Sequence, residues 1–155
     1  MATSENDLIS VIISDHRAFE RTFQELENGG GSSEHRRDLA DNLIAELMRH
    51  SVAEEQHMYP AAREALDDGD EVVDHELEEH AEAEQIMKEL EGVEATDDRF
   101  DELVSKLIGE VRHHLEEEEE NLLPRLQAAC SADQLRELGY EVLRAKESAS
   151  TRPQP

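Results

Sequence analysis

The sequence is poor in the residues on which several classes of protein depend. Its single cysteine, Cys130, excludes an internal disulfide, and without a local partner motif we interpret it as a packing residue at a helix end. Aromatic residues make up only 3% of the chain, and segments typical of β-strands are almost absent. No apolar run approaches the roughly 18 residues of a membrane-spanning helix, and the N-terminus lacks the features of a signal peptide. We therefore expect a cytoplasmic protein.

Basic side chains are scarce as well. The chain has 15 lysines and arginines against 40 acidic residues, which gives a formal net charge of -25. This charge repels phosphate backbones and anionic lipid surfaces, so we expect no nucleic-acid partner and no membrane partner, while cations are attracted. A chain of 155 residues can bury a core without disulfides or a structural metal. We expect a monomer with one domain at residues 1–148 and a polar, flexible tail at 149–155.

Apolar residues recur at steps of three and four along most of the chain, the spacing that keeps side chains on one face of a helix. Three segments rich in glycine or aspartate break this pattern, at residues 28–33, 67–70 and 92–98. Four helices remain, at about 4–27, 35–66, 71–91 and 97–129. Their short connections predict an all-α fold, an up-down-up-down antiparallel four-helix bundle. A short fifth C-terminal helix follows at 131–146, where Ser131 and Gln134 form a capping-box pattern, and we expect it to pack across the bundle or at one end.

Each of the four predicted bundle helices has an apolar stripe that is interrupted by one histidine. These histidines are His16, His50, His80 and His114. Three stripes also place a glutamate one helical turn from the histidine, namely Glu54, Glu76 and Glu118. A buried carboxylate without a partner is so costly that it takes up a proton or binds a cation. Imidazoles mixed with carboxylates suit iron or manganese, and seven ligands exceed the needs of one ion. The pattern therefore predicts two bridged metal ions.

Helices two and four of the predicted bundle share an internal repeat, HSVAEEQHMYPAA from His50 and HLEEEEENLLPRL from His114. In both segments, glutamates follow the histidine after four and five residues, and a proline follows after ten. Pro60 and Pro124 each remove a backbone hydrogen bond, so we expect each to kink or end its helix just beyond the ligands. This agreement of three residue types in register indicates that both helices serve the same site.

The chain resembles the hemerythrin, or HHE cation-binding, domains over nearly its whole length. The resemblance rests on the repeat above and on DHRAF at 15–19, EEHAEAEQIMKEL at 78–90 and LRELGYEVL at 135–143. It implies a four-helix bundle that holds two iron ions joined by an oxo or hydroxo bridge. It further implies that His16 and His50 bind one iron, that His80 and His114 bind the other, and that Glu54 and Glu118 bridge them.

Two positions depart from the family pattern. Hemerythrins proper have a second histidine one turn before His80, where this chain has Glu76; His75 is adjacent but rotated by about 100° around the helix, so we favour Glu76. Glutamate in place of histidine adds negative charge and favours ferric iron, which argues against reversible oxygen carriage. On the fourth helix Glu118 lies on the stripe, and Glu119 remains the alternative carboxylate ligand.

A ferritin-like di-iron carboxylate oxidase is a competing interpretation, because Glu54–His57 and Glu110–His113 match its Glu-x-x-His signature. We interpret His57 and His113 as surface residues, since they lie off the stripes and a chain this rich in glutamate yields such pairs by chance. The only phenols are Tyr59 and Tyr140. We assign neither to the site, although a phenol that reached it could donate a hydrogen bond or ligate iron.

The resemblance implies that the di-iron centre binds a small molecule, which could be oxygen, nitric oxide or peroxide. Our leading hypothesis is a protein that binds or senses a small diatomic or handles iron, because no further acid or base stands out on the stripes. The alternative is an enzyme that decomposes hydrogen peroxide at the same centre.

Overall fold

The computed structural model describes residues 6–148, which form helices and connecting turns without any β-strand. The helices are α1 (Leu8–Asn28), α2 (Ser33–Ala53), α3 (Tyr59–Ala65), α4 (Gly69–Glu91), α5 (Asp98–Glu117), α6 (Leu123–Ala129) and α7 (Ala132–Ser148). Two π-helical turns, η1 (Glu54–Met58) and η2 (Glu118–Leu122), join α2 to α3 and α5 to α6. None of these helices is long and apolar enough to cross a lipid bilayer. The predicted tail at 149–155 lies outside the described residues.

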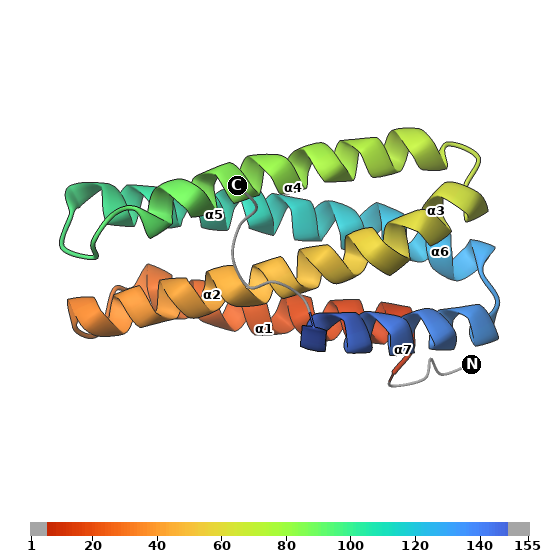
Figure 1. Cartoon of the computed structure of the whole chain (residues 1–155), viewed down its shortest axis with the longest axis horizontal. Helices are drawn as coiled ribbons and strands as arrows, with labels where there is room; N and C mark the ends of the chain where they lie inside the picture. Colours follow the sequence, from red (N-terminus) through yellow and green to blue (C-terminus); the bar gives the residue numbers. More distant parts are fainter. Residues whose placement is uncertain (1–5, 149–155) are drawn as a thin grey trace.

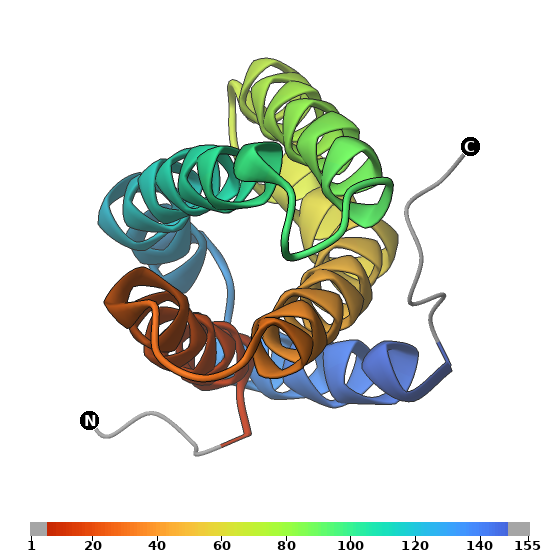
Figure 2. The ribbon, with the colours of Figure 1, turned by 90° about the vertical axis from the view of Figure 1, so that its left-hand side faces the viewer.

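The predicted antiparallel four-helix bundle is confirmed. Successive columns α1, α2–α3, α4 and α5–α6 alternate in direction along the long axis of the molecule (Figure 1). An end-on view shows these four columns around a common centre, with α7 outside them (Figure 2). Helix α7 packs along α1 and α2 over one half of the bundle, so it covers a side of the bundle and does not cap its end.

The predicted chain breaks coincide with helix caps. Gly29 ends α1 in the left-handed conformation, with φ of 69°, which a residue without Cβ adopts at little cost. Ser32 then begins α2, where its side chain accepts a hydrogen bond from the His35 amide at 3.1 Å. The predicted capping box also forms, because the Gln134 amide donates to the Ser131 hydroxyl and the Ser131 amide donates to the Gln134 side chain.

The prolines do not end their helices, and the kink that we named as the other outcome stays a prediction. The amides of Tyr59 and Leu123 donate to carbonyls five residues back, those of Glu54 and Glu118, which makes a π turn before each proline. Pro60 and Pro124 have no amide proton, and their rings crowd the carbonyl four residues earlier. The helix therefore widens by one residue and continues. Both π turns begin at a predicted ligand glutamate.

Two apolar clusters fill the bundle on either side of its middle. One cluster includes Phe23, Leu47, Leu90, Phe100 and Leu107, and the other includes Leu8, Ile12, Met58, Leu126 and Val142 from the half that α7 covers. Between the two clusters lies a layer of buried histidines and glutamates. Apolar packing therefore separates this polar layer from water at both ends of the bundle.

The close packing of α7 against the start of α1 generates a stability prediction. A Cβ atom at Gly139 would meet the Asn6 carbonyl oxygen and lie 2.8 Å from the Leu8 amide nitrogen, so backbone would have to move. We expect Gly139→Ala to lower the free energy of unfolding by about 1–3 kcal/mol in a urea titration. Gly109→Ala is the control, because a Cβ at this helical position meets nothing within 4 Å. It should raise stability by about 0.5–1 kcal/mol; equal effects of the two changes would contradict the packing argument.

Candidate metal centre

The structure brings all seven predicted ligand residues together in the polar layer at mid-bundle. None of them is more than 7% exposed. They come from all four columns: His16 from α1, His50 and Glu54 from α2 and η1, Glu76 and His80 from α4, and His114 and Glu118 from α5 and η2. Their burial in one layer is the arrangement that the interrupted apolar stripes predict.

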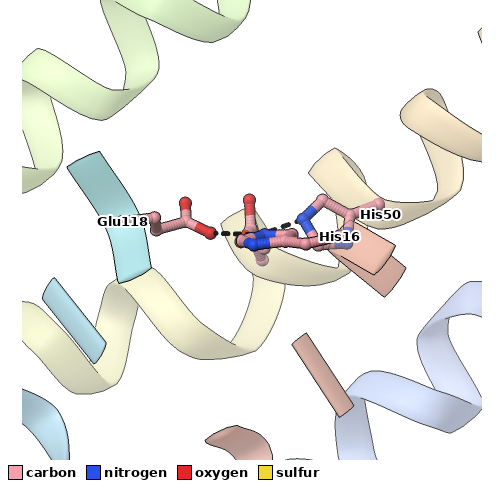
Figure 3. Close-up of side chains that lie close together, drawn as sticks. His16, His50 and Glu118 are labelled. Atoms are coloured by element: carbon pink, nitrogen blue, oxygen red, sulfur yellow. Dashed lines mark ion pairs between the residues drawn. The ribbon is translucent and has the colours of Figure 1, made fainter. Parts of the chain in front are cut away.

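The histidines form two pairs, and the pairs are those implied by the resemblance. The rings of His16 and His50 have centroids 5.3 Å apart, and those of His80 and His114 are 4.9 Å apart. Figure 3 shows the carboxylate of Glu118 pointing from η2 toward the first pair, with its ion pair to His16 marked by a dashed line.

Each buried glutamate of the π turns faces one histidine of each pair. Glu54 places one carboxylate oxygen 3.2 Å from Nε2 of His50 and the other 3.3 Å from Nε2 of His80. Glu118 likewise places its two oxygens 3.2 Å from Nε2 of His16 and 3.2 Å from Nε2 of His114. Both carboxylates therefore span the space between the two pairs, as a bridging ligand must.

Each histidine is oriented by a carboxylate from the neighbouring helix, which accepts the Nδ1 proton. The acceptors are Asp15 for His50 at 2.8 Å, Glu55 for His80 at 2.7 Å, Glu79 for His114 at 2.8 Å and Glu119 for His16 at 2.7 Å. These four bonds link α1 to α2, η1 to α4, α4 to α5 and η2 back to α1, which closes a ring around the bundle. We call them the outer ring. Since a carboxylate only accepts, Nδ1 carries the proton and the Nε2 lone pair is left for the centre.

Basic residues in turn hold part of the outer ring. Lys146 of α7 donates to Asp15 at 2.5 Å, and Arg17 donates to both carboxylate oxygens of Glu119, at 2.8 and 3.2 Å. Helix α7 is therefore connected to His50 through a single side chain, Asp15. The sequence reasoning gave no role to Asp15, Glu55 or Glu79 and considered Glu119 only as a ligand, although each is adjacent in sequence to a predicted ligand.

The sequence left two choices of ligand open, His75 or Glu76 and Glu118 or Glu119. The burial of these side chains in the structure distinguishes between them. Glu76 is 4% exposed, with Oε2 3.1 Å from Nδ1 of His114, whereas the neighbouring His75 side chain is 55% exposed. Glu118 is fully buried, while Glu119 lies in the outer ring with its side chain 22% exposed. The side chain of His113 is 65% exposed, on the surface as predicted.

Tyr59 also reaches the site, contrary to our decision to leave both phenols out. Its hydroxyl donates to Glu54 at 3.2 Å and to Glu118 at 3.3 Å, and lies 3.0 Å from Nε2 of His80. Burial and these negative charges raise the pKa of Tyr59 well above its ordinary value, so the phenol keeps its proton. Tyr140, in contrast, is 60% exposed. The π turn places Tyr59 inward, and α-helical spacing alone does not predict this.

At the centre, several buried nitrogen and oxygen atoms that can accept a hydrogen bond have no donor. His16 Nε2, His50 Nε2, His114 Nε2, Glu54 Oε2, Glu76 Oε2 and Glu118 Oε1 are all inaccessible to water and make no hydrogen bond. A buried polar atom left unpaired costs about 1–3 kcal/mol, so a set of six is unfavourable unless something else binds them. Cations satisfy nitrogen and carboxylate lone pairs together. The residues present therefore fit a metal centre.

Without metal, protons occupy this role. Burial alone would lower the pKa of each histidine, but the facing carboxylates outweigh burial and raise the pKa of His50 to about 10, of His80 to about 9 and of His114 to about 12. Burial, with the charges of neighbouring glutamates, raises the pKa of Glu76 to about 8 against the opposing effect of His114. The metal-free site therefore holds extra protons at neutral pH.

Comparisons with known proteins identify the family to which the chain is similar. The family model described as Hemerythrin HHE cation binding domain matches residues 7–126. An uncharacterised hemerythrin-like protein of Schizosaccharomyces pombe is 24% identical over 93% of this chain and 71% of its own length. A DNA nickase of a Nostoc species is 23% identical over 92% of this chain, which spans only 40% of that protein.

A solved structure shares the fold. The crystal structure of a hemerythrin HHE cation binding domain-containing protein from Mycobacterium kansasii superposes with a TM-score of 0.79 at 20% identity, over 92% of this chain and 86% of that one. The family match covers most of the chain and includes every residue of the buried histidine–glutamate layer. The chain belongs to the hemerythrin HHE cation-binding domain family.

Proposed function

We propose that the chain holds two bridged iron ions that bind a small diatomic molecule, such as oxygen or nitric oxide. The observation that carries this proposal is that Glu54 and Glu118 each face one histidine of each pair. His16 and His50 would hold one ion, and His80 and His114 would hold the other with Glu76. Such a pair of irons, when bound, can supply up to two electrons to a small ligand.

The space beside the centre supports a small ligand. A cavity of about 20 Å³ lies against His50, His80 and His114, and its other walls include Leu47, Met87 and Val111. This volume has room for about one water-sized molecule. A cavity of this volume excludes bulky substrates.

A nucleic-acid substrate, which the name of the Nostoc relative suggests, fits this chain poorly. Its formal net charge of -25 repels phosphate backbones. This chain also spans only 40% of that relative, so the match does not carry the relative's activity over to this chain.

Metal analysis tests the centre. We expect about two irons per chain after anaerobic loading with ferrous iron, and a near-ultraviolet absorption typical of an oxo bridge after exposure to air. His114→Ala should lose at least one iron, because Nε2 of His114 faces the carboxylate of Glu118 at 3.2 Å. His113→Ala is the matched control and should keep both, since its side chain is 65% exposed. One zinc per chain, without the absorption band, would reject the di-iron proposal.

Exchange of protons for metal generates a pH prediction. The raised pKa values of His50, His80 and His114 mean that the folded, metal-free protein binds more protons than the unfolded chain above pH about 6.5. The contribution of these histidines to stability is therefore fully present below that pH and is lost as pH rises through about 9 and 10. Urea unfolding of metal-free protein at pH 6.5, 8 and 9.5 should show a falling midpoint. The urea midpoint of iron-loaded protein should fall much less over the same pH range. An equal fall in both forms would contradict the exchange of protons for metal.

Tyr59 supports a second candidate function, the decomposition of hydrogen peroxide. The sequence offered no further acid at the centre, but the protonated phenol of Tyr59 supplies one, 3.0 Å from Nε2 of His80. It could donate a proton or a hydrogen bond to a peroxide held beside the pair, a step for which simple diatomic binding has no need.

Oxygen evolution after addition of hydrogen peroxide to iron-loaded protein separates the two functions. If the enzyme hypothesis holds, wild-type protein evolves oxygen well above free iron, and Tyr59→Phe lowers the rate by about 100-fold or more through loss of general-acid assistance. Iron content should be unchanged in this variant. Tyr140→Phe, altered at the exposed phenol, should behave as wild type. No turnover above free iron would leave diatomic binding as the function.

A further inference from the structure

A surface groove lies between α4 and the η2 turn, on the side of the bundle where Glu76 is buried. Its volume is about 360 Å³, and the residues that line it include Asp68, Glu71, His75, Glu76, Glu117 and Glu120. Five of these six side chains are carboxylates. An acidic groove of this kind concentrates cations from solution.

His75 and Glu117, which line the groove, come together with the adjacent Glu79 at the spacing of a metal site. His75 Nε2 lies 3.4 Å from Glu117 Oε2 and 3.7 Å from Glu79 Oε2. One ligand atom from each of the three residues lies within 4.8 Å of the other two. The His75 side chain is 55% exposed, so an ion can reach this cluster from water and keep water molecules as further ligands.

One carboxylate oxygen of this cluster is buried and accepts no hydrogen bond. Oε2 of Glu117, the atom that faces His75, is inaccessible to water and has no donor. An acidic surface that is merely solvated would have water at this atom. Glu117 instead presents an unused lone pair toward His75. Glu76 is 4% exposed and also lines the groove, but its Oε2 faces His114 at 3.1 Å and so belongs to the buried centre.

The cluster is joined directly to the buried centre. Glu79 turns Oε2 toward His75, while its other oxygen accepts the Nδ1 proton of His114 at 2.8 Å. Glu76 lies between the groove and the centre, because it lines the groove and also lies 3.1 Å from His114. A continuous series of ligand atoms therefore runs from water to the polar layer.

We propose that His75, Glu79 and Glu117 form a second, water-accessible site that binds a divalent first-row transition-metal ion and delivers it to the buried centre by way of Glu76. This inference rests on the metal centre proposed above. Delivery is an exchange of ligands without electron transfer: the ion leaves His75 and Glu117, gains Glu76, and keeps its charge of two.

The rate of iron uptake tests the proposal. Metal-free protein is mixed anaerobically with ferrous iron, the reaction is stopped with a ferrous chelator at increasing times, and protein-bound iron is measured. The variant His75→Ala/Glu117→Gln should load at least tenfold more slowly than wild type and reach the same final content. Glu79 is left unchanged because it orients His114. Circular dichroism checks that the variant is folded, which both exposed positions favour.

A matched control separates a binding site from general attraction by charge. His57→Ala/Glu116→Gln removes the same two side-chain types elsewhere, where His57 pairs with Glu141 and Glu116 is exposed. It should load at the wild-type rate. Equal rates for both variants, whether fast or slow, would overturn the proposal. A wild-type protein that takes up no iron would reject the buried centre itself, and this inference with it.

Zinc binding to iron-loaded protein gives an independent measurement. Calorimetric titration with Zn²⁺ should find one further ion per chain in wild type and in the control variant, and none in His75→Ala/Glu117→Gln. Zinc bound equally by all three proteins would place the extra ion elsewhere and overturn the assignment.

Discussion

The outer ring of four carboxylate–imidazole bonds is the interaction on which the rest of the centre depends. Each bond joins two helices and fixes the ring orientation of one histidine, so that Nε2 faces inward. Without these acceptors a buried imidazole could rotate and present either nitrogen, and the bridging arrangement of Glu54 and Glu118 would be lost. The ring also lets four buried histidines coexist with apolar packing on both sides, because half of each imidazole's hydrogen-bonding capacity is satisfied within the protein.

The outer ring is encoded by adjacent residues. A carboxylate directly precedes His16 and His80, and a second glutamate directly follows Glu54 and Glu118. Neighbouring positions on a helix point about 100° apart, so the ligand points inward while the adjacent carboxylate reaches sideways to the next helix. This geometry explains why the segments DHRAF and His-x3-Glu-Glu contain acidic pairs. It also explains why a search of the apolar stripes alone finds the ligands but not their supports.

The sequence predicted the helical columns, their order and the seven buried polar residues, because all of these follow from α-helical periodicity. The prediction from sequence was incomplete where the α-helical periodicity changes. Pro60 and Pro124 insert a π turn, after which every side chain is shifted by one position, and Tyr59 enters the centre for this reason. The sequence also did not predict which side of the bundle α7 covers. The apolar stripe of α7 indicates that the helix packs against the bundle, but it does not identify the two helices that α7 contacts. The contact of Lys146 with Asp15 is a consequence of that choice.

The bundle can also be described as two corresponding helical hairpins, α1–α2 and α4–α5, whose carboxylate–imidazole bonds repeat from one hairpin to the other. Asp15 corresponds to Glu79, Glu55 to Glu119, and the two π turns to each other. This correspondence fails at two positions beside the ligands: Ile12 of α1 stands where α4 has Glu76, and Leu123 stands where the first hairpin has Tyr59. Both polar members of these unmatched pairs contact the His80–His114 side. The two halves of the proposed centre are therefore chemically unequal, because the His80–His114 half has two polar side chains at positions where the His16–His50 half has apolar ones.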